Sequence, residues 1–154
     1  MSAVARKLEE LNIQIPAASK PAANYVPYAI CGNQIIVSGQ IPFVNGSVEG
    51  QVGKLGAGFT VDQGKEVAKV CAVNIISQLE DATGGNLDKV KCVRLGVFVN
   101  STPDFTEHPA VANGASDLIA EVFGENGKHA RAAVGVAALP FGVAVEVEAT
   151  FELI

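Results

Sequence analysis

The chain has few of the residues on which metal sites and disulfide frameworks depend. It contains no tryptophan, two histidines and three cysteines among 154 residues. Cys31, Cys71 and Cys92 are widely spaced and form no Cys-x-x-Cys pair, so we expect reduced, buried thiols rather than a disulfide framework or a zinc site. His108 and His129 have no second metal-type ligand at a useful spacing. The sequence therefore predicts a protein without a metal ion.

Basic residues are also scarce, which bears on nucleic-acid binding. The formal net charge is −5, and Arg6, Arg94 and Arg131 are scattered along the chain without any run of lysine or arginine. Nucleic-acid binding relies on clustered lysines and arginines that displace phosphate counterions. We therefore expect no nucleic-acid partner.

Long apolar runs are absent as well. No stretch approaches the roughly 20 residues that a membrane-spanning helix needs, and residues 1–12 lack the apolar core of a secretion signal. We expect a cytoplasmic protein that does not associate with a membrane. The composition is nevertheless apolar, with 49% hydrophobic and 18% charged residues. Because a small monomer must cover much surface with polar groups, this predicts one domain, residues 1–154, that packs against further copies of itself.

Apolar periodicity predicts three helices. The most clearly marked runs from Thr60 to Ala82, where Thr60 and Gln63 fit a capping box and Gly84-Gly85 ends the helix. The other two are predicted over residues 2–11 and 111–123. Between the first two helices, the Pro- and Ala-rich residues 16–23 are typical of an extended connector.

Five segments are typical of strands. They are Tyr25–Cys31 and Asn33–Ser38, which form a hairpin around Gly32, then Val90–Val99, Arg131–Ala138 and Val143–Glu152. The nearly continuous apolar run in the third predicts a strand covered on both faces, whereas the fifth alternates, with Glu146, Glu148, Thr150 and Glu152 on one side. The order of elements predicts an α+β fold with two main helices on one face of a mixed sheet.

The two closing strands carry the residues most suited to chemistry. A cation at Arg131 and a carboxylate at Glu146, placed by adjacent strands, would hold a small carboxylic acid and a water molecule, because a guanidinium fork matches a carboxylate with two hydrogen bonds. From the residues alone, a salt bridge at a strand end accounts for Arg131 equally well. A solvated strand face likewise accounts for the glutamates, and spacing does not choose among Glu146, Glu148 and Glu152.

Three motifs together resemble a known family. They are Val37-Ser38-Gly39-Gln40-Ile41-Pro42, then Val97-Phe98-Val99 with Asp104-Phe105, and the closing stretch from Ala130-Arg131 through Leu139-Pro140 to Val145-Glu146-Val147-Glu148-Ala149. In order, over about Ala22 to Leu153, the chain resembles the reactive intermediate deaminases, the RidA/YjgF or endoribonuclease L-PSP-like family, with residues 1–20 as an extra N-terminal helix and connector typical of a longer branch.

The resemblance implies a chorismate-mutase-like fold, a homotrimer with clefts between subunits, and cofactor-free hydrolysis of imines and enamines such as 2-aminoacrylate to 2-keto acids and ammonia. It makes Arg131 the anchor of the substrate carboxylate and Glu146 the residue that positions water. It also makes Tyr25, Ser38 and Gly39 candidates for contact with the substrate. A tyrosine half-buried at a subunit interface accounts for Tyr25 about as well, and a simple strand-ending turn accounts for Gly39 almost as well.

Two departures from the family pattern accompany the resemblance. Many members have cysteine where this chain has Ala133, so any role of the thiol is absent and only the backbone of Ala133 can line the cleft. The pattern Asp-Phe-x-x-x-Asn becomes Asp104-Phe105-Thr106-Glu107-His108-Pro109, which leaves the family's asparagine unmatched.

Three other functions compete with the deaminase. A non-catalytic trimeric binding module for a small carboxylate or keto acid would use Arg131 in the same way. Chorismate mutase shares the fold, but its dicarboxylate substrate needs several cations and the motif supplies only Arg131. The endoribonuclease activity attached to the family name is disfavoured, because the chain has neither a basic patch nor a catalytic pair of histidines.

Overall fold

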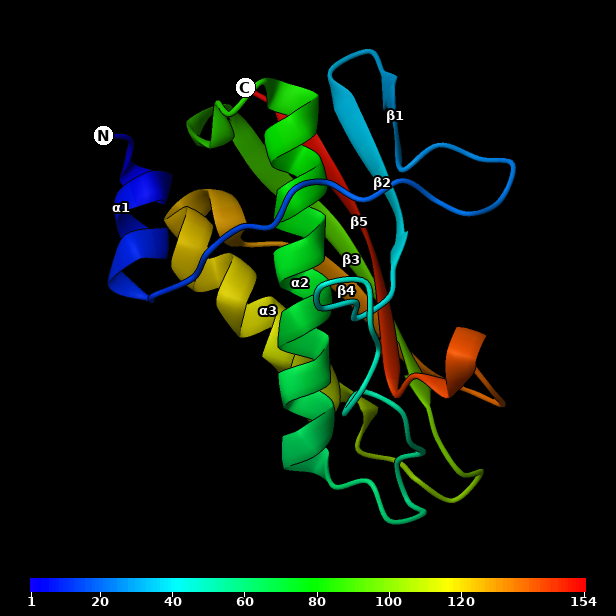
Figure 1. The fold of residues 1–154 in the computed structure, drawn as a ribbon. Coiled ribbons are helices and arrows are strands. Elements are labelled where there is room, and N and C mark those ends of the chain that lie inside the picture. The colour runs from blue at the N-terminus through cyan, green and yellow to red at the C-terminus, as the bar shows by residue number, and fades with distance from the viewer.

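A computed structural model describes residues 1–154 and contains one mixed sheet with three helices on one of its faces (Figure 1). This confirms the predicted α+β class. The helices are α1 (Ala3–Glu10), α2 (Val61–Thr83) and α3 (His108–Phe123). The strands are β1 (Tyr28–Cys31), β2 (Gln34–Gln40), β3 (Val90–Asn100), β4 (Ala130–Val136) and β5 (Val145–Leu153).

Helix α2 forms where the capping signals predict it. The Thr60 hydroxyl accepts a hydrogen bond from the backbone N–H of Gln63, and the Gln63 side chain accepts one from the backbone N–H of Thr60. At the other end Gly84 adopts a left-handed conformation with φ of 62° and ends the helix. Seven buried side chains of α2 join the hydrophobic core, as many as α3 contributes.

Helix α3 begins at His108, earlier than the predicted Val111. Pro109 lies in its first turn, where a proline costs nothing because the N–H groups of that turn have no partner within the helix. Strand β1 differs in the opposite sense and begins only at Tyr28, since Pro27 cannot donate a ladder hydrogen bond.

The strand order corrects one expectation about the closing strands. The order is β1-β2-β5-β3-β4, with β3 and β4 parallel and every other pair antiparallel. Strands β4 and β5 are therefore not adjacent, because β3 lies between them. The chain leaves β3, passes through α3 and returns in parallel along the sheet edge as β4, which is a βαβ unit.

The two faces of the sheet differ in what covers them. Residues such as Ile35, Leu95 and Val147 face the helices and are fully buried. On the other face no element of the chain packs, and Ile36 and Val134 are 45% and 47% exposed. The prediction that Val90–Val99 is covered on both faces is thus wrong for a single chain. The alternation along β5 is confirmed.

The N-terminal segment packs against the helical layer. Val4 and Leu8 of α1 join the hydrophobic core, as the predicted helix over residues 2–11 requires. The connector that follows has no regular structure and crosses α2 (Figure 1). Two side chains of α2 hold it, since the Ser77 hydroxyl and the Gln78 amide donate to the carbonyl oxygens of Pro16 and Ser19 at 2.7 and 2.8 Å.

The three cysteines are all unpaired but differ in burial. Cys71 and Cys92 are buried as predicted, and burial raises the pKa of the Cys92 thiol to about 12 and that of the Cys71 thiol well above its ordinary value. Cys31 is exposed at the end of β1, beside the Gly32-Asn33 turn, so its predicted burial is wrong. None of the three helices is long and apolar enough to cross a membrane.

Candidate functional site

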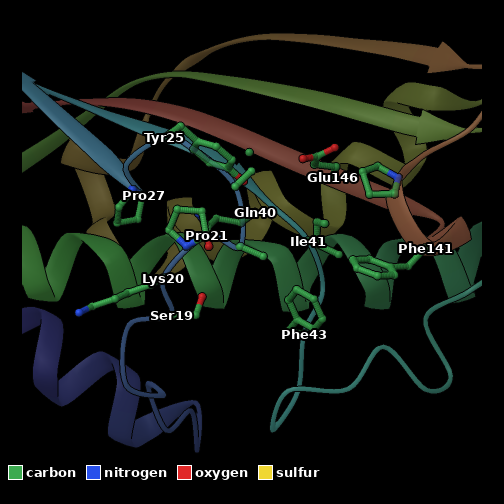
Figure 2. Close-up of a pocket in the computed structure, with 14 residues that line it drawn as sticks. Ser19, Lys20, Pro21, Tyr25, Pro27, Gln40, Ile41, Phe43, Phe141 and Glu146 are labelled. Atoms are coloured by element: carbon green, nitrogen blue, oxygen red, sulfur yellow. The ribbon is translucent and has the colours of Figure 1, made fainter.

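A cavity of about 350 Å³ opens beside the end of β2 and the start of β5. The connector closes one side, Ile41 and Phe43 after β2 close another, and the Pro140-Phe141 turn closes a third. Glu146 and Tyr25 project into this cavity (Figure 2). Two of the residues that the resemblance selected, from distant parts of the chain, therefore meet at one place.

Gly39 lies directly against the Glu146 carboxylate. A β-bulge interrupts the pairing of β2 with β5 between Val37 and Gln40, which brings the backbone of Gly39 up to the side chain of Glu146. A Cβ atom at residue 39 would stand 2.5 Å from Oε1 of Glu146. Only glycine leaves the carboxylate its present position, so Gly39 contributes space rather than a functional group.

The Glu146 carboxylate is half-buried and has no hydrogen-bond donor within the chain. Burial raises its pKa above the ordinary glutamate value, and the negative charge of Glu148 raises it further. Such a carboxylate is poorly solvated and more basic than an exposed one. It is suited to accept a proton from, or orient, a water molecule.

Tyr25 and Ser38 occupy different positions relative to the cavity. Tyr25 is 56% exposed and lies at the rim of the cavity that Glu146 also lines (Figure 2). The Ser38 hydroxyl instead donates to the carbonyl oxygen of Val26 at 2.7 Å. Ser38 therefore fixes the segment that carries Tyr25 and does not itself line the cavity.

Arg131 lies on the edge strand β4, and its guanidinium reaches α3. Nη1 donates to Oδ1 of Asn113 at 2.8 Å and to the hydroxyl oxygen of Ser116 at 3.1 Å. Nη2 donates to the carbonyl oxygen of Pro109 at 3.5 Å. No carboxylate pairs with this guanidinium, so its positive charge is positioned by neutral groups and is available to an anion.

The contacts of Arg131 extend to a histidine. Nδ1 of His129 lies 2.7 Å from the carbonyl oxygen of Gly127, and Nε2 lies 2.9 Å from the hydroxyl of Ser116. Because a carbonyl oxygen only accepts, Nδ1 donates there, and in the neutral imidazole Nε2 then accepts a hydrogen bond from the Ser116 hydroxyl. The Ser116 oxygen is then free to accept a hydrogen bond from Arg131, so that hydrogen bonds connect His129 to Arg131 through Ser116.

The sequence analysis missed Asn113, Ser116 and His129. Asn113 lies in α3, four residues and about one helical turn beyond Pro109, the position where the family pattern has asparagine. Asn113 and Ser116 are three residues apart, a spacing that puts both on one helix face. That spacing, with a histidine two residues before Arg131, is the signal from which the group could be found.

Arg131 and Glu146 do not meet within one chain. Arg131 is in register with Leu95, which faces the helices, whereas Glu146 is in register with Phe98 on the uncovered face. Ala133, two residues after Arg131, shares the side of Arg131 and packs against the core. The expectation that adjacent strands bring the cation and the carboxylate together is wrong for a single chain.

Comparison with known proteins gives the family. The sequence matches the YjgF/chorismate mutase-like family over residues 5–152. The chain belongs to this family. The fold expected from the resemblance is therefore confirmed, since the family's fold has the sheet and helices described above. The YjgF family description also carries an endoribonuclease activity as an unproven assignment.

Relatives of this YjgF family member come from distant organisms. A Trypanosoma cruzi protein, TCP17, is 56% identical over 97% of this chain and 94% of its own length. A RutC family protein of Pyrococcus abyssi is 34% identical over 86% of this chain and 88% of its own. The crystal structure of Atu1372 from Agrobacterium tumefaciens, a protein of unknown function, has 44% identity and a TM-score of 0.92 over 99% of this chain and 93% of that one.

Proposed function

We propose that this YjgF family protein hydrolyses reactive 2-imino acids and their enamine tautomers, of the 2-aminoacrylate type, to 2-keto acids and ammonia. The proposal places the reaction in clefts of a homotrimer, where one chain supplies Arg131 and the next supplies Glu146. No metal ion or organic cofactor takes part in this scheme.

The observation that carries the proposal is the separation of Arg131 and Glu146 on opposite faces of one sheet. A cation without an ion-pair partner and a poorly solvated carboxylate are the two groups that an anionic imine and its attacking water need. They complement each other only if two chains meet. The uncovered, partly apolar face of the sheet supports such packing of copies.

The chemistry is an addition followed by an elimination. The enamine first takes a proton on its terminal carbon and becomes the iminium ion. A water oxygen then forms a bond to the iminium carbon while Glu146 accepts one water proton, which gives a carbinolamine. That proton passes from Glu146 to the nitrogen, the carbon–nitrogen bond breaks, and ammonia leaves. The hydroxyl oxygen becomes the keto oxygen and releases its proton, which balances the proton that the enamine took up.

The resting charges fit these roles. Arg131 would hold the substrate carboxylate so that the imine carbon stays near the attacking water. Imines already react with free water, so positioning of this kind is enough to lower the activation barrier. The raised pKa of Glu146 makes its carboxylate a better proton acceptor than an exposed glutamate. We expect the rate to fall at acid pH as Glu146 takes up a proton.

A second candidate is a trimeric module that binds a keto acid without catalysis. The hydrogen bonds from Arg131 to Asn113 and Ser116 favour it, because they prepare a carboxylate site that does not involve Glu146. The absence of a thiol at Ala133 points the same way.

The experiment compares Glu146→Gln with the parent protein on a panel of enamines freshly made by a pyridoxal-phosphate lyase. We expect ammonia release by the variant to fall by about 10² to 10⁴-fold, as for loss of a general base, while binding of 2-ketobutyrate by calorimetry persists. Glu152→Gln, on the same strand and face, is the matched control. A parent protein that binds 2-ketobutyrate but accelerates no member of the panel would establish the binding module instead.

A further inference from the structure

The cavity beside Glu146 has an aromatic rim. Phe141 is 69% exposed, although it is a large apolar side chain, and its ring lies edge-on to that of Phe43 with centroids 6.0 Å apart. Both rings line the cavity that contains Glu146 (Figure 2). Neither ring belongs to the hydrophobic core of 30 buried residues, so the fold does not explain why residue 141 is aromatic.

The backbone of Phe141 adopts a conformation that disfavours phenylalanine. Its φ and ψ are 58° and 11°, in the left-handed region. The other two non-glycine residues with positive φ are Asn12 and Asn45, and asparagine tolerates this region well. A bulky residue there costs conformational energy, and such outliers are concentrated at functional sites.

Hydrogen bonds on both sides enforce this conformation. The N–H of Gly142 donates to the carbonyl oxygen of Leu139 at 2.9 Å, and the carbonyl oxygen of Gly142 accepts from the N–H of Gly53 at 3.1 Å. The N–H of Val143 donates to the carbonyl oxygen of Pro140 at 3.2 Å. These backbone hydrogen bonds therefore hold residue 141 at the cavity rim, independently of any contact that the phenyl ring makes.

We infer that Phe141 and Phe43 form an apolar subsite for the substrate side chain. The substrates it selects are 2-imino acids with neutral, apolar side chains larger than methyl, either branched aliphatic or aromatic. This inference rests on the proposed function and specifies its substrate class.

Two properties of the cavity support this class of substrate. Its volume of about 350 Å³ lies within the range of about 300–1,000 Å³ typical of small-molecule sites, whereas a three-carbon acid would fill a small part of it. Apart from Glu146, the one charged residue that lines it is Lys20, in the connector. A charged substrate side chain would therefore lose its hydrating water in this cavity and gain few charged partners in exchange.

The first test uses the unmodified protein. Imino acids are generated from alanine, leucine and phenylalanine by an amino-acid oxidase, and hydrolysis is measured in competition with trapping by semicarbazide. We expect kcat/KM for the imino acids made from leucine and phenylalanine to exceed that for the imino acid made from alanine by at least about tenfold, since one methylene in an apolar pocket changes kcat/KM by about 10- to 200-fold. Equal rates, or a preference for the alanine product, would overturn the subsite and leave the proposed function intact. Acceleration of none of the three would instead count against the proposed function.

The second test separates the ring from the backbone of residue 141. Phe141→Asn keeps a residue that tolerates positive φ but removes the apolar surface, and Phe141→Leu keeps apolar surface on the same backbone. We expect Phe141→Asn to lower kcat/KM about tenfold for the phenylalanine product and less than twofold for the alanine product, and Phe141→Leu to retain activity on the leucine product. Equal losses on all substrates, or a changed oligomeric mass by light scattering, would show that the ring serves folding or subunit contact and would overturn the inference.

Discussion

Arg131 and Glu146 are held in opposite ways. The guanidinium of Arg131 donates to three oxygen atoms of its own chain, and a histidine fixes one of these acceptors. The Glu146 carboxylate receives no hydrogen bond, lies against the backbone of Gly39 and is partly desolvated. The side chain of Arg131 is thus fixed by its own chain, whereas the carboxylate of Glu146 is left without a hydrogen-bond partner.

The difference indicates which part of the site depends on a partner. A cation fixed by neutral oxygen atoms is ready to bind an anion as soon as one arrives. The pKa of the Glu146 carboxylate, in contrast, is raised by burial and by the charge of Glu148, and no group of the same chain offsets this by donating a hydrogen bond. Under the proposed function, its hydrogen-bond partners are water and the substrate held by a neighbouring chain.

The largest effect is expected when intact Arg131 and intact Glu146 are supplied by different chains. Arg131→Ala and Glu146→Gln are each expected to lower activity by at least about 10²-fold. If the two variants are co-expressed with different tags and mixed trimers are isolated, each trimer contains one complete site in three. Activity should recover to about a third of the parent value with an unchanged KM, measured as ammonia release.

The controls for this experiment are the two homotrimers, taken through the same purification. Failure of the mixed trimers to recover activity would mean that Arg131 and Glu146 do not combine between chains. It would then contradict the proposed arrangement of the cleft, because the single chain keeps the two residues on opposite faces of the sheet.

A smaller effect is expected from the residues that hold the arginine. Asn113→Ala and Ser116→Ala each remove one acceptor of Arg131, at a cost of about one hydrogen bond to a charged group, or 1.5–3 kcal/mol. We expect KM for imino acids to rise about tenfold while kcat changes little, by steady-state kinetics. Ser116→Thr retains a hydroxyl and should restore KM, and a fall in kcat with constant KM would contradict a positioning role.

The smallest effect concerns stability and follows from the raised pKa of Glu146. Between the ordinary glutamate pKa, about 4.3, and the raised value, the folded protein binds more protons than the unfolded chain, so stability decreases as pH rises through this window. Glu146→Gln removes the buried charge and should have a higher Tm at neutral pH. The gain should vanish below the ordinary glutamate pKa, as scanning calorimetry can measure against Glu9→Gln on the exposed face of α1.

The elements of the fold were predictable because local signals mark them. The capping box at Thr60, the glycines after α2 and the alternation along β5 each act within a few residues. The strand order was not predictable by the same reasoning, because the position of β5 between β2 and β3 depends on contacts between distant segments. The expected adjacency of β4 and β5 failed for this reason.

The site shows the same division. Motif resemblance selected Glu146, Gly39 and Tyr25, and the fold brings these three to one cavity. It could not find Asn113, because this asparagine lies one helical turn beyond the position that the pattern specifies, and only the fold shows that it contacts Arg131. Nor did it draw attention to Phe141, whose importance lies in a backbone angle that no residue pattern reveals.

The residues around Arg131 and the residues that line the cavity beside Glu146 are two separate sets, and this separation affects how substrate range can evolve. The residues that hold Arg131 belong to α3, β4 and the turn before β4, and none of them lines the cavity beside Glu146. Under the proposed function, a point mutation in the aromatic rim or the connector would therefore change which substrate side chains are accepted without altering the carboxylate anchor. Descendants of such a protein can diverge in specificity through single steps, because no step requires the anchor to be rebuilt.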